Sequence, residues 1–456
     1  MKGLFKQVDI TSIVFMRIVY GLLAFGELMG MYVYYHLTKD TFNPAAFHFT
    51  YYGLEWVKPL PEPFISMVFI LGLIAALCVA LGKFYRVACI VTGLILMYAF
   101  CMEETLYLNH GYLMTCLAFI LAFFPMNRSF SLDVLKRPER RLTRVPVYYQ
   151  FILAFLMGVV YFYGGIAKMN PDWIRAQPLL IWMEYKKNLF LIGPIIQKDI
   201  VAWVMSIGGL AFDLSAAFLL MFKRTRKLGM GLAISFHLIN VLIFNIGAFP
   251  WLSLALSLMF FPSTLLPNFF HWLDRKVPIW ARQRARYRNY FGTDQREMPI
   301  SPRLNRQMRV CLILLVGFNL LMPLRHHLYT GNVNWTEEGH KFSWRMMLRN
   351  KSGVGSFVIK DESGEIIDTE DGREYLTKRQ RFKMLGQPDM ILQFAQFLGD
   401  KYEAEGHGQV SVHADIKVRL NGNSFQRFID KEVDLRAVKW HPFQSQEWIL
   451  PFEYDY

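Results

Sequence analysis

Charged side chains are scarce in this chain of 456 residues. Asp, Glu, Lys and Arg together make up 19% of it, whereas soluble domains usually carry about 25%. Hydrophobic residues account for 54% and aromatic residues for 16%, and the mean hydropathy is +0.23. Disordered, collagen-like and coiled-coil proteins do not have this composition. It indicates instead a chain that spends much of its length in a lipid bilayer.

Familiar catalytic and metal-binding motifs are missing as well. The sequence has no G-x-S-x-G, no P-loop, no H-E-x-x-H and no G-x-G-x-x-G after a strand. This excludes the hydrolase, NTPase, zinc-peptidase and dinucleotide-binding classes that depend on those motifs. The five cysteines form no C-x-x-C pair, and the 11 histidines are scattered. We interpret the cysteines as small buried apolar residues, and no bound metal is predicted.

Long apolar runs fill the chain from position 10 to position 324. A membrane-spanning helix needs about 20 mostly apolar residues, and nine segments approach that length. The eighth is short and begins near Pro250, so it either re-enters the membrane or ends at its surface. We predict an α-helical polytopic membrane bundle of about eight or nine spans over residues 1–324, followed by a soluble domain over residues 325–456. The nine segments are 10–35, 64–82, 86–102, 111–126, 147–166, 200–222, 228–247, 249–262 and 308–324.

Basic residues are concentrated in the membrane part. It carries 32 Lys and Arg against 16 Asp and Glu, while the part from Arg325 onward carries 18 against 20. Most of the surplus lies in loops on one side of the predicted bundle, which places the N-terminus in the cytoplasm. Nine crossings put the C-terminal domain outside, in the periplasm or a lumen, and an even number would put it inside. The stretch 274–309 is predicted to lie along the lipid surface, and no nucleic-acid partner is predicted.

The C-terminal domain has the patterns of a β-rich α+β fold. Residues 407–420 alternate apolar and polar side chains, as a half-buried strand does. Residues 354–369 predict two strands joined by a Glu-Ser-Gly turn. Residues 389–402 carry apolar side chains at helical spacing. We expect a sheet with one helix packed on it, in an extracytoplasmic domain.

Lys168 follows an apolar run at the outer end of the fifth predicted span. One interpretation is a lysine that reaches the membrane surface and anchors the helix end. The other is a functional amine that Tyr161, Tyr163 and Trp173 partly shield from water. Desolvation disfavours an ammonium ion, so such a lysine would be available as a base.

Three further polar side chains are predicted at the same depth as Lys168. Asn109 and His110 begin the fourth span, and His237 lies in the outer half of the seventh. Asn109 could cap its helix, and His237 could form a hydrogen bond between helices. Ionisable groups within spans are rare and usually have paired or functional roles. Their shared depth favours a common site.

Three other ionisable residues also lie in predicted spans. Arg17 and Asp213 both fall in the cytoplasmic halves of their helices, and we interpret them as a buried structural ion pair. Glu27 lies in the outer half of the first span. It either forms a hydrogen bond to a neighbouring helix or faces the zone of Lys168.

Seven longer motifs point to a known family. They include LNHGYL around His110, GGIAKMNPDW around Lys168 and AFDLSAAFLLMF around Asp213. SFHLINVLIFNIGAF, NWTEEGHKFSWRMM, FQRFIDKEVDLRAVKWHPF and SQEWILPF follow along the chain. With these motifs the chain resembles the vitamin K-dependent γ-glutamyl carboxylases, within the wider bacterial group called horizontally transferred transmembrane domain proteins.

The resemblance implies vitamin K-dependent γ-carboxylation. In that family a lysine at the position of Lys168 deprotonates reduced vitamin K (phylloquinol or menaquinol), which reacts with dioxygen toward the epoxide. The strong base formed on the way removes a γ-proton from a glutamyl side chain, and the carbanion captures carbon dioxide. The family histidine and asparagine that match His110 and Asn109 assist this chemistry. The quinone pocket is expected to be lined by His237, Tyr161, Tyr163 and Trp173.

The resemblance also implies a glutamyl site in the C-terminal domain. Trp335 and Trp344 keep their family places, and His340 stands where the family has a tyrosine implicated in substrate binding. These three residues are expected at the glutamyl entrance. A cysteine pair of animal members is replaced by Phe49 and Phe394, for which an apolar contact is expected.

Two alternative functions stay open on the sequence. One is a quinol epoxidase that acts on a different protein acceptor or on none. The other is a non-catalytic quinone-binding membrane protein that reuses the fold. The expected partners are an isoprenoid quinol, the lipid bilayer and, for the carboxylase, a glutamate-containing peptide or protein. The expected location is the bacterial inner membrane or the endoplasmic reticulum, as a multi-pass integral membrane protein.

Overall fold

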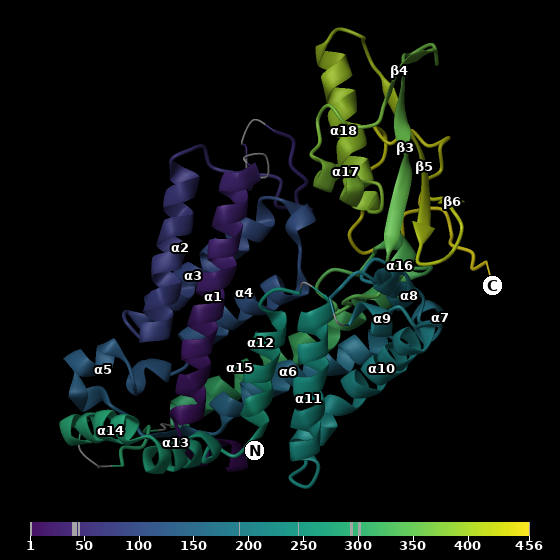
Figure 1. Cartoon of the computed structure of the whole chain (residues 1–456). Helices are drawn as coiled ribbons and strands as arrows, with labels where there is room; N and C mark the ends of the chain where they lie inside the picture. The colour runs from purple at the N-terminus through teal and green to yellow at the C-terminus, as the bar shows by residue number, and fades with distance from the viewer. Residues whose placement is uncertain are drawn as a thin grey trace.

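The structure is a helical bundle joined to a C-terminal domain that is built on a β-sheet (Figure 1). It is a computed structural model that describes residues 2–38, 43, 46–190, 192–244, 246–291, 295–299 and 302–455. The predicted fold class, a polytopic helical bundle followed by an α+β domain, is confirmed.

Each of the nine predicted apolar segments forms a helix. Among the described residues, six helices are long and apolar enough to cross a membrane, or seven if one bent pair counts as a span. Two more, α3 and α4, are apolar but shorter, at 17 and 14 residues. The nine segments correspond to α1 (Thr11–Thr38), α2 (Phe64–Leu81), α3 (Tyr85–Cys101), α4 (Asn109–Ala122), α6 (Tyr148–Ala167), α10 (Asp199–Met221), α11 (Arg226–Ile243), α12 (Phe249–Ser257) and α15 (Pro302–Leu321).

The eighth predicted span is bent. Helix α12 continues into the 3-10 helix η5 (Leu258–Phe260), and the chain then turns by 101° into α13 (Leu265–Lys276). Pro262 lies in the break, where a residue without a backbone N–H interrupts helical hydrogen bonding. The result is a broken span or a re-entrant loop, as its short length suggested.

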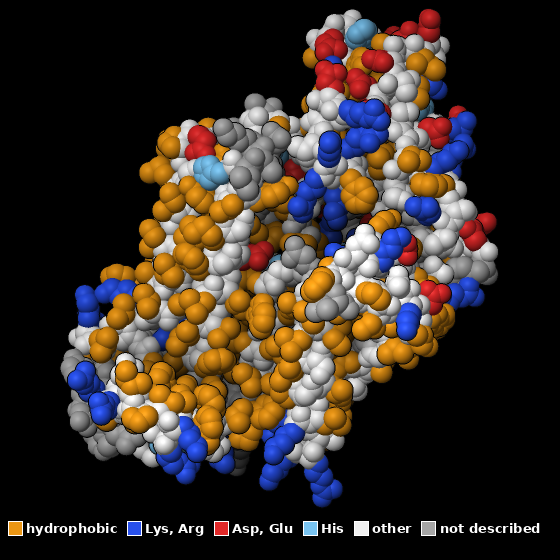
Figure 2. Space-filling view, in the orientation of Figure 1, with side chains coloured by type: hydrophobic (Ala, Val, Ile, Leu, Met, Phe, Trp, Pro, Cys, Tyr) orange, Lys and Arg blue, Asp and Glu red, His pale blue; other side chains and the backbone are white. Residues whose placement is uncertain are grey.

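Basic side chains gather at the end of the bundle away from the C-terminal domain. Helix α13, α14 (Pro278–Phe291), α5 (Leu132–Lys136) and the N-terminus all lie at that end (Figure 1). Figure 2 shows Lys and Arg side chains along the same edge, below a broad hydrophobic surface. The length of the bundle therefore separates the basic loops from the C-terminal domain.

Helix α6 is the most enclosed of the candidate spans. Of its most apolar window, 78% is buried inside the protein, compared with 6% for the candidate span Arg306–Leu328. A helix that is apolar on every side is stable where other helices surround it. Lys168 follows the C-terminal end of α6, so this central position brings the lysine into the interior of the bundle.

Short elements complete the membrane part. Strands β1 (Gln7–Asp9) and β2 (Arg144–Pro146) pair antiparallel at the end of the bundle that holds the N-terminus. The remaining short helices are η1 (Lys2–Phe5), η2 (Glu104–Leu106), η3 (Met126–Arg128), η4 (Pro138–Arg140), α7 (Pro171–Ile174), α8 (Gln177–Glu184), α9 (Gly193–Ile196) and η6 (Met322–Leu328).

The C-terminal domain has a four-stranded antiparallel sheet in the order β4-β3-β5-β6. The alternation in β5 places Val412, Ala414, Ile416 and Val418 on the buried face, each fully enclosed. Helix α18 packs against that face, so the predicted strands and helix are confirmed. The elements are α16 (Val333–Thr336), β3 (Lys351–Lys360), β4 (Ile366–Glu370), α17 (Lys378–Met384), α18 (Pro388–Ala404), β5 (Ser411–Leu420) and β6 (Gln426–Arg427).

An apolar contact joins the loop after α1 to the C-terminal domain. Phe49 and Phe394 are both fully buried in the core of that domain. The ring of Phe47 packs on both, with centroids 4.9 Å from Phe49 and 5.7 Å from Phe394. Nearby, Lys341 forms ion pairs with Glu104 and Asp389. The two parts of the chain are thus held together without a disulfide at these positions.

Candidate active site

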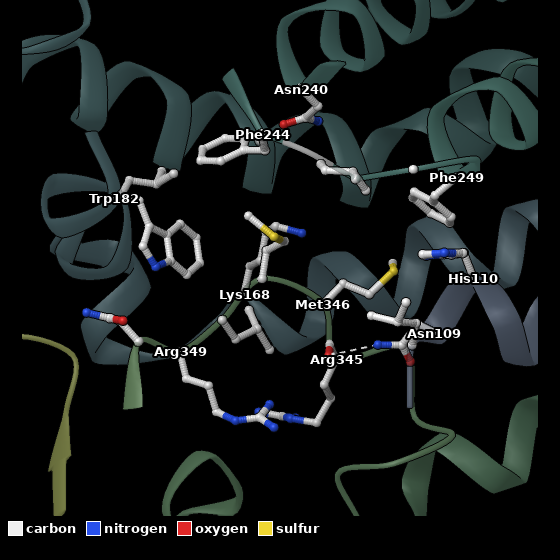
Figure 3. A pocket seen from close by; sticks show the side chains of 18 of the residues that line it. Asn109, His110, Lys168, Trp182, Asn240, Phe244, Phe249, Arg345, Met346 and Arg349 are labelled. Carbon is white, nitrogen blue, oxygen red and sulfur yellow. Dashed lines mark hydrogen bonds between the residues drawn. The ribbon is translucent and has the colours of Figure 1, made fainter. Parts of the chain in front are cut away.

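A cavity of about 860 Å³ lies where the helical bundle meets the C-terminal domain. Helices α1, α4, α6, α10 and α11 form its walls, and residues 345–351 border it on the side of the C-terminal domain (Figure 3). An apolar cavity with a few polar groups is typical of a small-molecule site. The polar lining includes Glu27, Asn109, His110, Lys168, Asp213, His237, Asn240, His340, Arg345 and Arg349.

Lys168 and Asp213 form a buried ion pair in this cavity. Lys168 Nζ lies 2.5 Å from Asp213 Oδ2, and the two residues are only 5% and 4% exposed. Lys168 Nζ also lies 5.2 Å from the centre of the Trp173 ring and 3.4 Å from the carbonyl oxygen of Gly164. The lysine therefore points into the protein, and its interpretation as a surface anchor is wrong.

Two glycines of the motif GGIAK bring the ion pair together. A Cβ atom on Gly165 would lie 2.8 Å from the backbone nitrogen of Leu214 in α10, and one on Gly164 would lie 3.4 Å from Asp213 Oδ2. Small residues let membrane helices approach closely. Helix α6 ends at Ala167, so Lys168 leaves the helix next to the part of α10 that carries Asp213.

The predicted ion pair between Arg17 and Asp213 is wrong. Arg17 donates hydrogen bonds to the carbonyl oxygens of Met126, Ser129 and Phe130 at the other end of the bundle. Helix α10 is longer than α6, and its first turns extend past the end of α6. Asp213 is therefore level with Lys168 rather than with Arg17.

His110 is paired with a carboxylate of the first helix. Its Nε2 lies 3.4 Å from Glu27 Oε1, and their side chains are 10% and 15% exposed. Gly247 adopts a left-handed φ of +65°, and a Cβ atom on it would lie 3.7 Å from the same nitrogen. Of the two interpretations of Glu27, the one in which it faces the Lys168 zone is the one observed.

Asn109 is held by hydrogen bonds on two sides. The hydroxyl of Tyr107 donates to Asn109 Oδ1 at 3.1 Å, and Asn109 Nδ2 donates to the carbonyl oxygen of Arg345 at 3.3 Å (Figure 3). The same hydroxyl accepts the backbone N–H of Phe342 at 2.6 Å. The residue before the helix is Leu108, so the capping interpretation of Asn109 is wrong. Asn109 instead links α4 to the C-terminal domain.

His237 and Tyr161 form a hydrogen-bonded pair in the cavity wall. His237 Nε2 lies 2.9 Å from the Tyr161 hydroxyl oxygen, which is also 3.0 Å from Ser257 Oγ. His237 thus bonds between helices and also lines the cavity. Both interpretations of this histidine are observed.

Trp173 lines the cavity as predicted, but Tyr163 does not. The Tyr163 hydroxyl donates to the carbonyl oxygen of Leu320 in α15 at 2.6 Å. With 3.6 residues per helical turn, residues two apart point to nearly opposite sides. Because Tyr161 faces the cavity, Tyr163 faces away from it.

The aromatic residues predicted at the glutamyl entrance also need correction. Trp335 is fully buried in the C-terminal core, where its Nε1 donates to the carbonyl oxygen of Leu450 at 2.8 Å. Trp344 is 2% exposed and packs 5.2 Å from the Tyr112 ring. Neither lines the cavity, because both rings fill apolar cores on either side of it. Of the three predicted residues, only His340 reaches the cavity wall.

The sequence interpretation missed a cluster of cations at the cavity rim. Arg345, Arg349, Lys351 and Lys383 all line it. Their one close acidic partner among the described residues is Glu337, which lies 2.7 Å from Arg349 and 3.3 Å from Lys351. The spacing of Arg345, Arg349 and Lys351 just after a buried aromatic segment was the signal available in the sequence.

Burial changes the protonation of this rim. Desolvation, reinforced by the charge of Arg349, lowers the pKa of Lys351 and of Lys383 to about 8. The same causes lower the pKa of Arg345 to about 10. Burial also holds the pKa of His340 well below its usual value, and Arg349 lies 3.0 Å from His340 Nδ1. At neutral pH the rim is therefore a positively charged surface with a neutral imidazole.

A second, larger cavity of about 1460 Å³ lies on the other side of residues 337–342. It shares Tyr107 and Glu337 with the first. None of the site residues predicted from the sequence lines it. Lys168, Asn109, His110 and His237 all line the smaller cavity instead.

Among the side chains that the structure describes, no three His, Cys, Asp or Glu residues are grouped to hold a metal ion. The polar groups that line the cavity are amines, carboxylates, imidazoles, amides, phenols and guanidinium ions.

Two family models match the chain and together cover most of it. Residues 5–264 match the HTTM domain, and residues 304–455 match the lumenal domain of the vitamin K-dependent gamma-carboxylase. The helical bundle and its cavity thus define a multi-pass membrane protein of the HTTM class.

The chain belongs to the vitamin K-dependent γ-carboxylase family. The resemblance predicted from the sequence motifs is confirmed, and a γ-carboxylase-like, vitamin K-dependent function follows from it. No solved structure matches the chain.

Proposed function

We propose that this protein oxygenates reduced vitamin K to its epoxide and uses the base so formed to carboxylate glutamyl side chains. One observation carries the proposal. Lys168, His110 and Asn109, which the resemblance assigns to the quinol, line one cavity whose rim is a cluster of cations. The proposal makes Lys168 the base for a hydroquinone and the cation cluster the binding surface for a carboxylate, and their position around one cavity supports both roles.

The cavity suits a naphthohydroquinone with an isoprenoid tail, such as phylloquinol or menaquinol. Trp182, Phe244 and Phe249 supply flat apolar walls around Lys168 (Figure 3). A phenolic hydroxyl has a pKa of about 10, so a lysine amine can deprotonate it. The γ-carbon of a glutamyl side chain is far too weak an acid for a lysine amine to deprotonate. Oxidation of the bound quinol by dioxygen supplies the missing base strength, and carbon dioxide is the second co-substrate.

Asn109 and His110 are suited to bind the quinol oxygen. One N–H of the Asn109 amide is used by the Arg345 carbonyl, which leaves the other free for a ligand. Glu27 fixes the imidazole of His110. Prearranged donors of this kind stabilise negative charge as it develops on oxygen. His237, Tyr161 and Trp173 complete the quinol pocket.

The glutamyl side chain is proposed to meet the cation cluster. A guanidinium group binds a carboxylate through two parallel hydrogen bonds, and Arg345 and Arg349 both face the cavity. In Figure 3 they lie below Lys168, with Phe244 above it and Trp182 to its left. A glutamyl carboxylate held there directs its γ-carbon toward the quinol. His340 packs against Arg349 and fixes its position.

The proposal includes an orientation in the membrane. We place the N-terminus and helices α13 and α14 in the cytoplasm, and the cavity with the C-terminal domain in the periplasm or lumen. The basic side chains at the far end of the bundle support this orientation (Figure 2). The protein would lie in the bacterial inner membrane or the endoplasmic reticulum.

The test is an assay of purified protein in lipid nanodiscs with reduced vitamin K, labelled bicarbonate and a glutamate-rich peptide. We expect both epoxide and labelled peptide from the wild type. Lys168→Ala should lower both by about 10²- to 10⁴-fold, the usual range for a lost general base. Lys198→Ala is the matched control, because Lys198 is exposed and outside the cavity. Epoxide formed by Lys168→Ala at the wild-type rate would refute the assignment of the base.

A second candidate function is quinol epoxidation with a different acceptor or with none. The observation that favours it is His340, which stands in place of the family tyrosine and is buried against Arg349. Epoxide without labelled peptide in the same assay would select this function. A purely structural quinone-binding role is a poorer account, because burying Lys168 and Asp213 has a large desolvation cost.

A further inference from the structure

The ion pair between Lys168 and Asp213 raises the question of which group can accept a proton from the quinol. An ammonium ion carries its full set of protons and cannot accept another from a hydroxyl group. A carboxylate at 2.5 Å favours that charged form. If Lys168 first lost its proton to solvent, Asp213 would be left as a lone buried anion, which is costly. A base made of the amine alone therefore does not fit this site.

We propose that Asp213 is the final acceptor of the proton that the quinol gives up, and that Lys168 passes the proton on. This inference rests on the proposed function. The O–H bond of the quinol breaks as an N–H bond forms on Lys168. Another N–H bond of Lys168 breaks as an O–H bond forms on Asp213. No electrons are transferred, and the products are a quinol monoanion, an ammonium ion and a neutral carboxylic acid.

The charges favour this transfer. The site is neutral overall before the proton moves and stays neutral afterwards, so no net charge is created in a water-poor cavity. The negative charge moves from Asp213 to the quinol oxygen, and the Lys168 ammonium remains to stabilise it. Electrostatic stabilisation of this kind is strongest where water is excluded.

The geometry allows both steps. Lys168 and Asp213 both line the cavity, and the close contact of α6 and α10 at Gly165 fixes their separation. Trp173 covers the amine, and its own Nε1 is fixed by a hydrogen bond of 2.9 Å to the carbonyl oxygen of Ser206. The only hydrogen bond of Asp213 within the described ranges goes to Lys168. Its second oxygen is therefore available to hold a proton.

The rival account is that Asp213 only neutralises and positions Lys168. The two accounts differ for Asp213→Asn, which keeps the size and a hydrogen-bond acceptor but removes the proton acceptor. Under the rival account this variant frees a neutral amine, and the amine still ionises a phenol. Under our proposal the variant loses most of that ability, because the transfer must then create a new ion pair in a water-poor cavity instead of moving the negative charge of an existing pair. Asp213→Glu keeps the existing pair and retains much of the ability.

The first test follows proton transfer without turnover. 2-Methyl-1-naphthol changes its absorption on ionising and needs no dioxygen. We expect the bound probe to be ionised in the wild type at pH 7.5, and about tenfold less so in Asp213→Asn, equivalent to one pKa unit. Infrared difference spectra should show a carboxylic-acid band on probe binding that shifts in Asp213→Glu and vanishes in Asp213→Asn. Equal ionisation in wild type and Asp213→Asn would overturn the proposal.

The second test measures epoxide formation with matched controls. Asp213→Asn should lower the rate by about 10²-fold or more, while Asp199→Asn, at the exposed start of α10, should leave it unchanged. Formate should restore part of the rate of Asp213→Ala, and sodium chloride at the same ionic strength should not. Full activity of Asp213→Asn, or equal effects of formate and chloride, would refute the role of Asp213 and leave the proposed function standing. A wild type that ionises the probe but makes no epoxide would refute the proposed function and not this inference.

Discussion

His110 Nε2 and Glu27 Oε1 lie 3.4 Å apart, on helices α4 and α1. The contact joins the start of one helix to the middle of another, and Gly247 closes around the same imidazole. A carboxylate next to a histidine fixes the orientation and tautomer of the ring. Glu27 therefore fixes the imidazole of His110, which we propose binds the quinol.

Glu27→Gln should slow epoxide formation by about 10- to 100-fold, because the buried His110 loses the charged partner that fixes its ring, and a buried polar group left without its partner costs about 1–3 kcal/mol. The quinol KM should change less than kcat, since Glu27 acts through His110. Steady-state epoxide assays with Glu62→Gln, in the exposed loop before α2, as the control would measure both constants. An unchanged kcat in Glu27→Gln would show that His110 does not depend on this carboxylate.

Arg349→Ala should impair glutamyl binding more than epoxide formation. The lost charge-assisted hydrogen bonds should raise the KM for a glutamyl peptide by about 10- to 100-fold, with the quinol KM unchanged. Arg373→Ala is the matched control, because Arg373 is 77% exposed and lies outside the cavity. If the two variants had the same peptide KM, the cation cluster would not be the glutamyl site.

The affinity for the glutamyl peptide should fall as the pH rises above 8. Lys351 and Lys383 have a pKa of about 8 in the free protein, and a bound carboxylate raises both values. Binding therefore takes up protons, so the dissociation constant should increase with pH by up to about tenfold per unit for each lysine. Titrations from pH 7 to 9.5 would measure it, with Lys383→Met expected to have a shallower dependence. An affinity constant up to pH 9.5 would contradict the proposed role of these lysines.

Gly165→Ala should destabilise the bundle and separate Lys168 from Asp213. The added Cβ would lie 2.8 Å from the Leu214 backbone nitrogen, and overpacking of this kind costs about 1–3 kcal/mol. Gly208→Ala is the control, because a Cβ there meets nothing within 4 Å. Thermal unfolding in nanodiscs should show a lower Tm for Gly165→Ala only. Equal Tm values would mean that α6 and α10 are not as tightly packed as described.

Much of the fold could be predicted from the sequence, because the lipid bilayer and water select different patterns of apolar residues. Long apolar runs in the first part form helices, and the alternation in β5 gives the buried face of the C-terminal sheet. The bend between α12 and α13 was harder to predict, since a short apolar segment is compatible with several membrane geometries.

The site could be predicted only in part. Lys168, Asn109, His110 and His237 stood out because polar groups are rare in spans, and they do share a cavity. Asp213 was assigned to the wrong partner. The position of a residue within its span does not show how far neighbouring helices are displaced along their axes, because tertiary packing sets that displacement.

Residues outside the spans were harder to interpret. Arg349 belongs to a segment where basic residues are ordinary, so its spacing from Arg345 and Lys351 was only a weak signal. Trp335 lies near it in the chain, but its apolar ring is buried in the domain core instead of facing the cavity. Only the three-dimensional packing shows that Arg349 faces the cavity while Trp335 is buried in the core.

The most direct test of the account is an experimental structure of the protein in nanodiscs with a bound naphthoquinone. The account predicts that the ring lies between Trp182 and Phe249, with one ring oxygen within hydrogen-bond distance of Lys168 Nζ. A ring bound in the second cavity, beyond residues 337–342, with no contact to Lys168, would contradict it.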